Sequence, residues 1–391
     1  LDILNCGAGS TNDSDQYYGP AAYRPQLIPD QRVQQQDLNH STPGRSTSFR
    51  LPWGSTHDVI PPLVMERTPP KALRHIEKNG NLLRARDFQG EFNHECIRFA
   101  RLAWRSRVIN LLEVGGKMVA VILTPFVLIT YLMFVYLLAP EETWLSVLQG
   151  FLPAIFWAIG FPASAWLCAR VIFKLFPGWC VKNGKGPEWE LNRRTGMVTQ
   201  WHYSRKLPFR KQIAPQIIQA PFYEFDGWVL AGADRFGPRF DFVLCHRYQK
   251  LIVRIGDDLL SWHRFPDMCY AFWDFIQNYM DVTRPLPDIP ALEAYRHLDP
   301  VTADHDRKNK RSARHWRDMD DRTFDQKVRQ MFSDIKRINI EKRPNLMAKK
   351  VRYAHMTPED MLAYGRGSRQ SRQRRAKSGL KKEPIRSVPS D

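Results

Sequence analysis

The sequence lacks the short motifs that identify most enzymes and metal proteins. Its six cysteines are scattered, without a CxxC pair or a zinc-ligand spacing. It holds no glycine-rich phosphate loop, no GxSxG nucleophile elbow, and no second histidine at helical spacing after His94-Glu95. Asp304-His305-Asp306 comes nearest to a metal cluster, but adjacent residues do not readily point at one ion. We therefore expect no cofactor, no metal and no catalytic residue, in a protein that is not an enzyme.

Charge is missing from two long stretches in the middle of the chain. Residues 118–139 and 143–169 contain no Asp, Glu, Lys, Arg or His, and only Pro140-Glu141-Glu142 separates them. At 1.5 Å per residue, each stretch can cross a hydrocarbon core of roughly 30 Å. The pattern predicts a hairpin of two transmembrane helices; the alternative is a pair of buried helices in a large soluble core. Without ionisable residues, the hairpin is an anchor rather than an ion or proton pathway.

The residues next to the two stretches predict their orientation and packing. Basic residues precede the first stretch and follow the second, while the short loop carries only two glutamates. Because positive charge is retained in the cytoplasm, we expect a two-pass protein with both termini cytoplasmic. Gly160 and Ser164 form a small-xxx-small pair that suits close packing inside the hairpin or between two copies, and we favour the hairpin.

The residues before the hairpin divide into two parts. Residues 1–70 are rich in Gln, Ser, Pro, Gly and Asn, which predicts a disordered tail. Residues 71–117 are expected to form a juxtamembrane amphipathic helix region, with an apolar face and a basic stripe of Arg98, Arg101 and Arg105. The stripe either contacts anionic lipid headgroups or faces solvent on a helix packed against the next domain.

Residues 187–281 have the pattern of a cytosolic α+β domain. Residues 192–196 (NRRTG) predict a hairpin turn, and aromatic or β-branched runs predict strands at 222–230, 240–245 and 250–255. Residues 266–280 read as the amphipathic helix that closes these antiparallel strands. Exposed aromatic and arginine side chains dominate protein interfaces, so we select candidate partner contacts on this domain: Tyr223, Trp228, Arg235 and Arg239.

The remainder of the chain is charged. Residues 282–362 are expected to hold a linker and basic amphipathic helices; the helix at 321–342 suits a membrane surface, a partner groove or its own domain. Residues 363–391 are expected to form a disordered basic tail that can contact lipid phosphates, and the lack of aromatic residues at 366–382 disfavours nucleic acid. The tail residues selected for lipid contact are Arg366, Arg369, Arg372, Arg374 and Arg375.

The order of four features resembles a known but uncharacterised family. Two spans are followed by ELNRRTG at 190–196, PFYEFDGW at 221–228 and FWDFIQNYM at 272–280, and then by a proline-rich exit. This arrangement, over about residues 114–290, is similar to bacterial two-span inner-membrane proteins that are often encoded beside type VI secretion effectors. The resemblance implies a bacterial inner (plasma) membrane location and a role in effector handling or immunity. It implies no catalytic residues.

Three functional hypotheses are compatible with these observations. The first is a membrane-anchored module that binds a partner protein. The second is an electrostatic module that binds anionic lipid or nucleic acid, whose binding falls steeply with salt. The third is a membrane-bound enzyme with an unrecognised site in the β-rich domain, which requires a deep polar cleft. We favour the first.

Overall fold

The computed structural model describes residues 17–31, 47–81, 89–138, 143–180, 183–203, 215–235, 237–249, 251–256, 265–340 and 342–351. These residues divide into two compact units. Unit 1 comprises those of residues 1–79, 91–98 and 189–391, and unit 2 those of residues 80–90 and 99–188. Unit 2 is thus inserted into the sequence of unit 1. The two boundaries at the ends of residues 99–188 fall inside strands β3 (Cys96–Leu102) and β4 (Asn183–Asn192).

Unit 2 contains the two uncharged stretches as long helices, as predicted. α4 (Trp104–Met133) continues into a π-helical turn (Phe134–Leu138), and the apolar helix Trp104–Leu137 has 34 residues. α5 (Trp144–Ile155), a second π-helical turn (Phe156–Gly160) and α6 (Phe161–Leu175) give 32 more, before the short α7 (Pro177–Cys180). Both helices are longer than the predicted spans. In their most apolar windows only 6% and 0% of residues are buried, unlike the core helices of a soluble protein.

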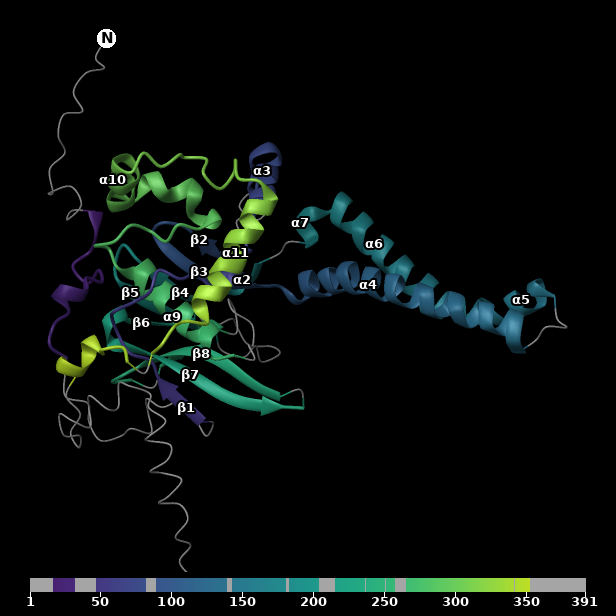
Figure 1. The fold of residues 1–391 in the computed structure, drawn as a ribbon, viewed down its shortest axis with the longest axis horizontal. Helices are drawn as coiled ribbons and strands as arrows, with labels where there is room; N and C mark the ends of the chain where they lie inside the picture. Colours follow the sequence, from purple (N-terminus) through teal and green to yellow (C-terminus); the bar gives the residue numbers. More distant parts are fainter. Residues whose placement is uncertain are drawn as a thin grey trace, which may run out of the picture. The chain divides into compact units, whose positions relative to one another are not determined.

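The two long helices pack against each other within the chain. α4 lies alongside α6 (Figure 1), and a Cβ atom at Gly116 would lie 2.8 Å from the carbonyl oxygen of Pro162. Only glycine permits this approach. A Cβ at Gly160 would instead meet its own helix, at Phe156. The predicted hairpin packing is present, but its close contact lies at Gly116 rather than at Gly160. Near the tip, the Tyr131 hydroxyl donates to the Trp144 carbonyl at 3.0 Å.

The described strands form two antiparallel sheets. The first has the order β1-β7-β8-β9 and consists of β1 (Thr47–Arg50), β7 (Phe225–Asp234), β8 (Gly237–His246) and β9 (Ile252–Val253). The second has the order β2-β3-β4-β5-β6 and adds β2 (Glu91–Phe92), β5 (Met197–His202) and β6 (Gln216–Pro221). The predicted turn joins β4 to β5, and Gly196 has the positive φ (+74°) expected there. The strands predicted around 222–255 are confirmed with shifted ends.

The predicted closing helix is the centre of unit 1. α9 (Asp267–Met280) is buried on every side except at Asp267 and Tyr270, rather than along one apolar face. Trp273 contacts the rings of Trp53, Phe222 and Phe242, and its indole comes so close to Gly227 that a Cβ there would lie 2.9 Å away.

The rest of unit 1 is built from short helices that cover these elements. α2 (Pro62–Met65) and α3 (Pro70–Asn79) precede β2, and 3-10 segments occur at Pro25–Leu27, Phe222–Glu224, Pro290–Leu298 and Leu346–Lys349. α10 (Pro300–Lys308) and α11 (Asp321–Ile335) follow α9. α11 contacts α2, α3 and α9 (Figure 1) and buries Phe324, Val328 and Ile335. Of the three roles predicted for this amphipathic helix, the structure shows packing of its apolar face within its own domain.

Two predictions about the region before the hairpin are wrong. Residues 17–31 and 47–70 are folded rather than disordered: Trp53 is fully buried, and Tyr23 is 2% exposed. Residues 96–102 form strand β3 instead of a helix, because the Asn93 side chain accepts the backbone N–H groups of Glu95 and Cys96 and turns the chain into a β2–β3 hairpin. The helix starts only at Trp104. Residues 1–16, 32–46 and 352–391, including the predicted basic tail, lie outside the described residues.

Candidate functional site

Polar residues on α9 hold the segment that follows Trp53. Asp274, Gln277 and Asn278 lie at positions i, i+3 and i+4 and therefore share one face of the helix. The side-chain oxygen Oε1 of Gln277 accepts the backbone N–H of Gly54 at 2.8 Å. The Asp274 carboxylate accepts the backbone N–H of His57 at 3.1 Å. Asn278 donates to the carbonyl of His57 at 3.0 Å. This irregular segment thus obtains the hydrogen bonds that a strand neighbour would otherwise supply.

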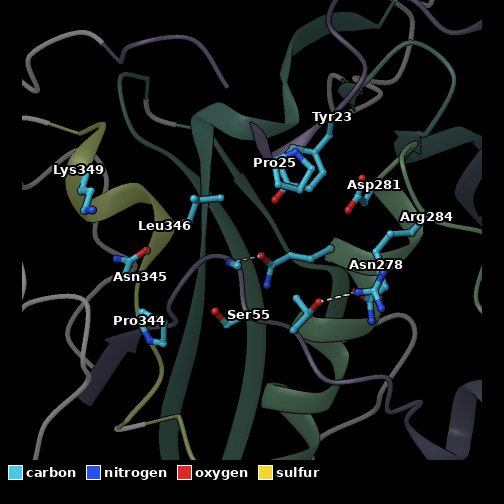
Figure 2. A pocket seen from close by; sticks show the side chains of 13 residues that line it. Tyr23, Pro25, Ser55, Asn278, Asp281, Arg284, Pro344, Asn345, Leu346 and Lys349 are labelled. Atoms are coloured by element: carbon cyan, nitrogen blue, oxygen red, sulfur yellow. Dashed lines mark hydrogen bonds between the residues drawn. The ribbon is translucent and has the colours of Figure 1, made fainter. Parts of the chain in front are cut away.

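A cavity of about 560 Å³ opens at the C-terminal end of α9. In Figure 2, Lys349, Asn345 and Pro344 face Asp281, Arg284 and Asn278 across the opening, with Tyr23 and Pro25 above and Ser55 below. Four stretches far apart in sequence therefore build one site inside unit 1. The lining residues are Tyr23, Pro25, Gly54, Ser55, Thr56, Gln277, Asn278, Asp281, Arg284, Pro344, Asn345, Leu346 and Lys349.

Arg284 is fixed in the wall of this cavity. Its Nη1 donates to Asn278 Oδ1 at 2.7 Å and to Thr56 Oγ1 at 3.1 Å. The Thr56 hydroxyl in turn donates to Asn278 Oδ1 at 2.6 Å, so the three side chains form a closed triangle (Figure 2). A guanidinium held in this way loses little further conformational entropy when it binds a ligand.

The floor of the cavity carries an unsatisfied donor and an unusual backbone. Gln277 is 2% exposed, and its Nε2 has no hydrogen-bond partner. Gly54 and Ser55 both have positive φ, +76° and +49°. For a serine this conformation costs about 1–3 kcal/mol, and it persists only where the surroundings impose it. Such features collect at binding sites, and here both lie in the wall of one cavity.

A buried ion pair fixes the end of α9 behind the cavity. Arg193, from the β4–β5 turn, is fully buried and pairs with the equally buried Asp299 at 3.2 Å. Its remaining donors bind the backbone carbonyls of Tyr279, Asp281 and Arg284. The Asp299 carboxylate also accepts from the Tyr18 hydroxyl at 2.6 Å. Arg193 therefore neutralises the carbonyls at the helix end and holds the chain that presents Asp281 and Arg284.

A second buried network lies between β1, β7 and the turn after β8. Asp226 accepts from Arg247 at 2.8 Å, from Arg50 at 3.1 Å and from the Trp53 indole at 3.2 Å. Burial raises the pKa of this carboxyl, but the two guanidiniums lower it more, so the pKa lies below the ordinary value. The bonds of Asp226 thus join β7 to β1, to the Trp53 indole and to the turn after β8. We assign this network to the stability of the fold.

Hydrogen bonds hold the His246 ring in the same buried region, so we assign it a structural rather than a catalytic role. Its Nδ1 accepts the backbone N–H groups of Tyr248 and Gln249, so Nε2 carries the proton that it donates to Glu224 at 2.9 Å. The side chain is 1% exposed. Across the described ranges, no group of three His, Cys, Asp or Glu side chains is placed to hold a metal ion.

The four residues predicted to contact a partner differ in their exposure. Trp228 is buried with Leu230, Val243 and Cys245 in the core of the first sheet, so this choice is wrong. Along β7, alternation places Trp228 on the face opposite to Gly227, which packs against Trp273 of α9. Tyr223 is half-buried. Arg235 and Arg239 are exposed near the tip of the β7–β8 hairpin.

The residues predicted to contact lipid also differ in their surroundings. Arg98 pairs with Glu190 at 2.5 Å, and Arg101 with Glu188 at 3.0 Å, so both residues bind strand β4 instead of forming a helical stripe. Arg105 is exposed in the first turn of α4. The five arginines at 366, 369, 372, 374 and 375 lie outside the described residues.

Comparison with known proteins gives no relative. The chain matches no protein-family model, no curated protein and no solved structure.

Sequence reasoning missed the cavity altogether. Its residues come from segments assigned to a disordered tail, to a helix read only for its apolar face, and to a charged linker. One signal was present: Asp274, Gln277 and Asn278 place a polar stripe among the aromatics of residues 272–280. A buried helix with such a stripe must hydrogen-bond another segment.

Proposed function

We propose that this chain is a membrane-anchored binding protein, in which the hairpin of unit 2 spans the membrane and unit 1 binds a partner protein without catalysis. The proposal rests on the exposure of the two long helices: in the most apolar window of each helix, almost no residue is buried. Residues 118–137 are uncharged and helical, and 20 residues at 1.5 Å give about 30 Å, the thickness of a hydrocarbon core. Left in water, their large apolar side chains would aggregate.

The insertion of unit 2 into unit 1 supports an even number of crossings. The residues before the hairpin (91–98) and after it (189–351) belong to the same compact unit. A domain cannot fold with its halves on opposite sides of a bilayer. If the helices span, the chain must therefore cross twice and return to the same side. This argument is independent of the flanking positive charge, which favours the cytoplasmic side of a bacterial inner membrane.

The tip of the β7–β8 hairpin is our candidate surface for the partner protein. β1 pairs with β7 at residues 228–231, so residues 232–235 and 237–239 extend beyond this neighbour (Figure 1). Arg235 and Arg239 are exposed there. The family resemblance suggests a secretion effector as the partner. The basic residues before the hairpin suggest anionic headgroups as a second contact, through Arg105.

Extraction of bacterial membranes tests the anchor. We expect the full chain to stay in the pellet after carbonate or high-salt washing and to enter solution only with detergent. Release by carbonate would contradict a spanning hairpin. A protease added outside intact spheroplasts should leave unit 1 uncut.

A tagged pull-down from mild-detergent membranes tests the binding module. We expect one protein to remain in near-stoichiometric amount through a high-salt wash. The double variant Arg235→Ala/Arg239→Ala should lose it, whereas Arg322→Ala/Arg329→Ala, the same charge change at exposed positions of α11, should retain it. Recovery of only lipid or nucleic acid, removed by salt, would favour an electrostatic module instead.

A further inference from the structure

Three side-chain donors in the wall of the cavity at the end of α9 are left for a ligand. Gln277 Nε2 has no hydrogen-bond partner in the described part of the chain, although the side chain is nine-tenths buried. Arg284 Nη2 forms an ion pair with the carboxylate of Asp58 at 4.0 Å, which is outside hydrogen-bond distance. The ammonium group of Lys349 makes no hydrogen bond or ion pair with any described residue. A buried donor without an acceptor costs about 1–3 kcal/mol, so these groups favour a ligand rich in acceptors.

The charged side chains that line the cavity also favour an anion. Arg284 and Lys349 line it together with a single carboxylate, Asp281, so the lining carries one net positive charge (two minus one). The Asp58 carboxylate, which pairs with Arg284 at 4.0 Å, is 84% exposed and lies outside the lining. Asp281 Oδ1 already accepts from the Thr283 hydroxyl at 2.7 Å and from the Thr283 N–H at 3.0 Å. A helix C-terminus normally repels anions. Here the buried guanidinium of Arg193 binds the last carbonyls and removes that repulsion.

The remaining walls suit an organic body rather than a bare ion. Pro25, Pro344 and Leu346 supply apolar surface, and the ring of Tyr23 lies beside Pro25 (Figure 2). The volume of about 560 Å³ lies in the range of small-molecule sites, roughly 300–1,000 Å³.

We propose that this cavity binds a small organic anion, a carboxylate or phosphate ester with an apolar or aromatic body. Arg284 and Lys349 contact the oxyanion from opposite walls, and Gln277 Nε2 donates to it from the floor. The body packs against Tyr23, Pro25 and Leu346. This inference goes beyond the proposed function and does not depend on it, because every residue used lies in unit 1. A failure of membrane extraction or of the pull-down leaves it standing.

Calorimetric titration of the detergent-solubilised full chain tests the site. The probes are phenyl phosphate, benzoate and benzyl alcohol, which share an aromatic body and differ in charge. We expect saturable binding of at least one anion at micromolar to millimolar concentration, and none of the alcohol. Preference for phenyl phosphate assigns a phosphate site, and preference for benzoate a carboxylate site. No saturable binding of either anion, or equal binding of the alcohol, overturns the proposal.

Two matched variants separate the site from the general basicity of the chain. Lys349→Glu and Lys342→Glu make the same change in charge at exposed positions, but only Lys349 lines the cavity. We expect Lys349→Glu to weaken anion binding by about tenfold or more and Lys342→Glu by less than about twofold. Arg284→Gln should match Lys349→Glu. Equal weakening by the two lysine variants would assign the binding to net charge and refute the site.

Discussion

Removal of the buried guanidinium of Arg193 should be among the most damaging single changes in unit 1. Arg193→Met leaves the Asp299 carboxylate buried without its partner and takes a donor from three backbone carbonyls. Breaking a fully buried ion pair costs about 3–5 kcal/mol, because the remaining charge has neither water nor a counterion. Most domains are stable by only about 5–15 kcal/mol, so this loss is a large part of the total.

The neighbouring arginine supplies the control. Arg194 is 48% exposed and pairs with Glu95 at 3.0 Å, so Arg194→Met should cost about 0–1 kcal/mol after screening by solvent. Urea unfolding of the detergent-solubilised chain, followed by tryptophan fluorescence, compares the two. The double variant Arg193→Met/Asp299→Asn should be less destabilised than Arg193→Met alone, because it removes the stranded charge. Equal losses for Arg193→Met and Arg194→Met would refute the assignment.

Three further changes test other parts of the fold. Burial raises the pKa of Asp226, but two arginines lower it more, so the pKa of the folded protein lies below the ordinary value of 3.8. The contribution of the Asp226 carboxylate to the free energy of unfolding should therefore be complete above pH 3.8 and be lost as the pH falls below it. The difference in unfolding free energy between the wild type and Asp226→Asn should shrink over the same pH range. Trp53→Ala should cost about 3–5 kcal/mol in urea unfolding, whereas Leu27→Ala, at a position 71% exposed, should cost about 0.5 or less. Gly116→Leu should lower the melting temperature of the hairpin in detergent, and Gly150→Leu, where a Cβ meets nothing within 4 Å, should leave it unchanged.

The parts of the fold that were predicted correctly rest on local patterns. Residues 118–139 and 143–169 are uniformly apolar, and Gly196 and Pro266 mark a turn and a helix start within a few residues of the elements that they delimit. Such signals need no knowledge of distant contacts.

The errors arose where distant contacts decide the structure. The spacing of apolar residues at 92, 96, 99 and 103 fits a helix, but Arg98 and Arg101 find glutamates on β4, about 90 residues later, and form a strand. The segment around Trp53 has the composition of a tail, yet Asp274, Gln277 and Asn278 supply its hydrogen bonds. The cavity depends on these same long-range bonds, and the polar stripe of Asp274, Gln277 and Asn278 was its one sign in the sequence.

The insertion of unit 2 into unit 1 also sets an order of events during synthesis. The ribosome completes residues 17–98 before it makes the hairpin, but α9, which covers Trp53, follows about 170 residues after β3. At about 5–20 residues per second, the early segment waits roughly 10–35 s for its core. Throughout that interval the aromatic side chains of the early segment lack the helix that covers them. Unit 1 can therefore close only after the ribosome has made both long helices, so the proposed membrane anchor would be available for insertion before unit 1 folds.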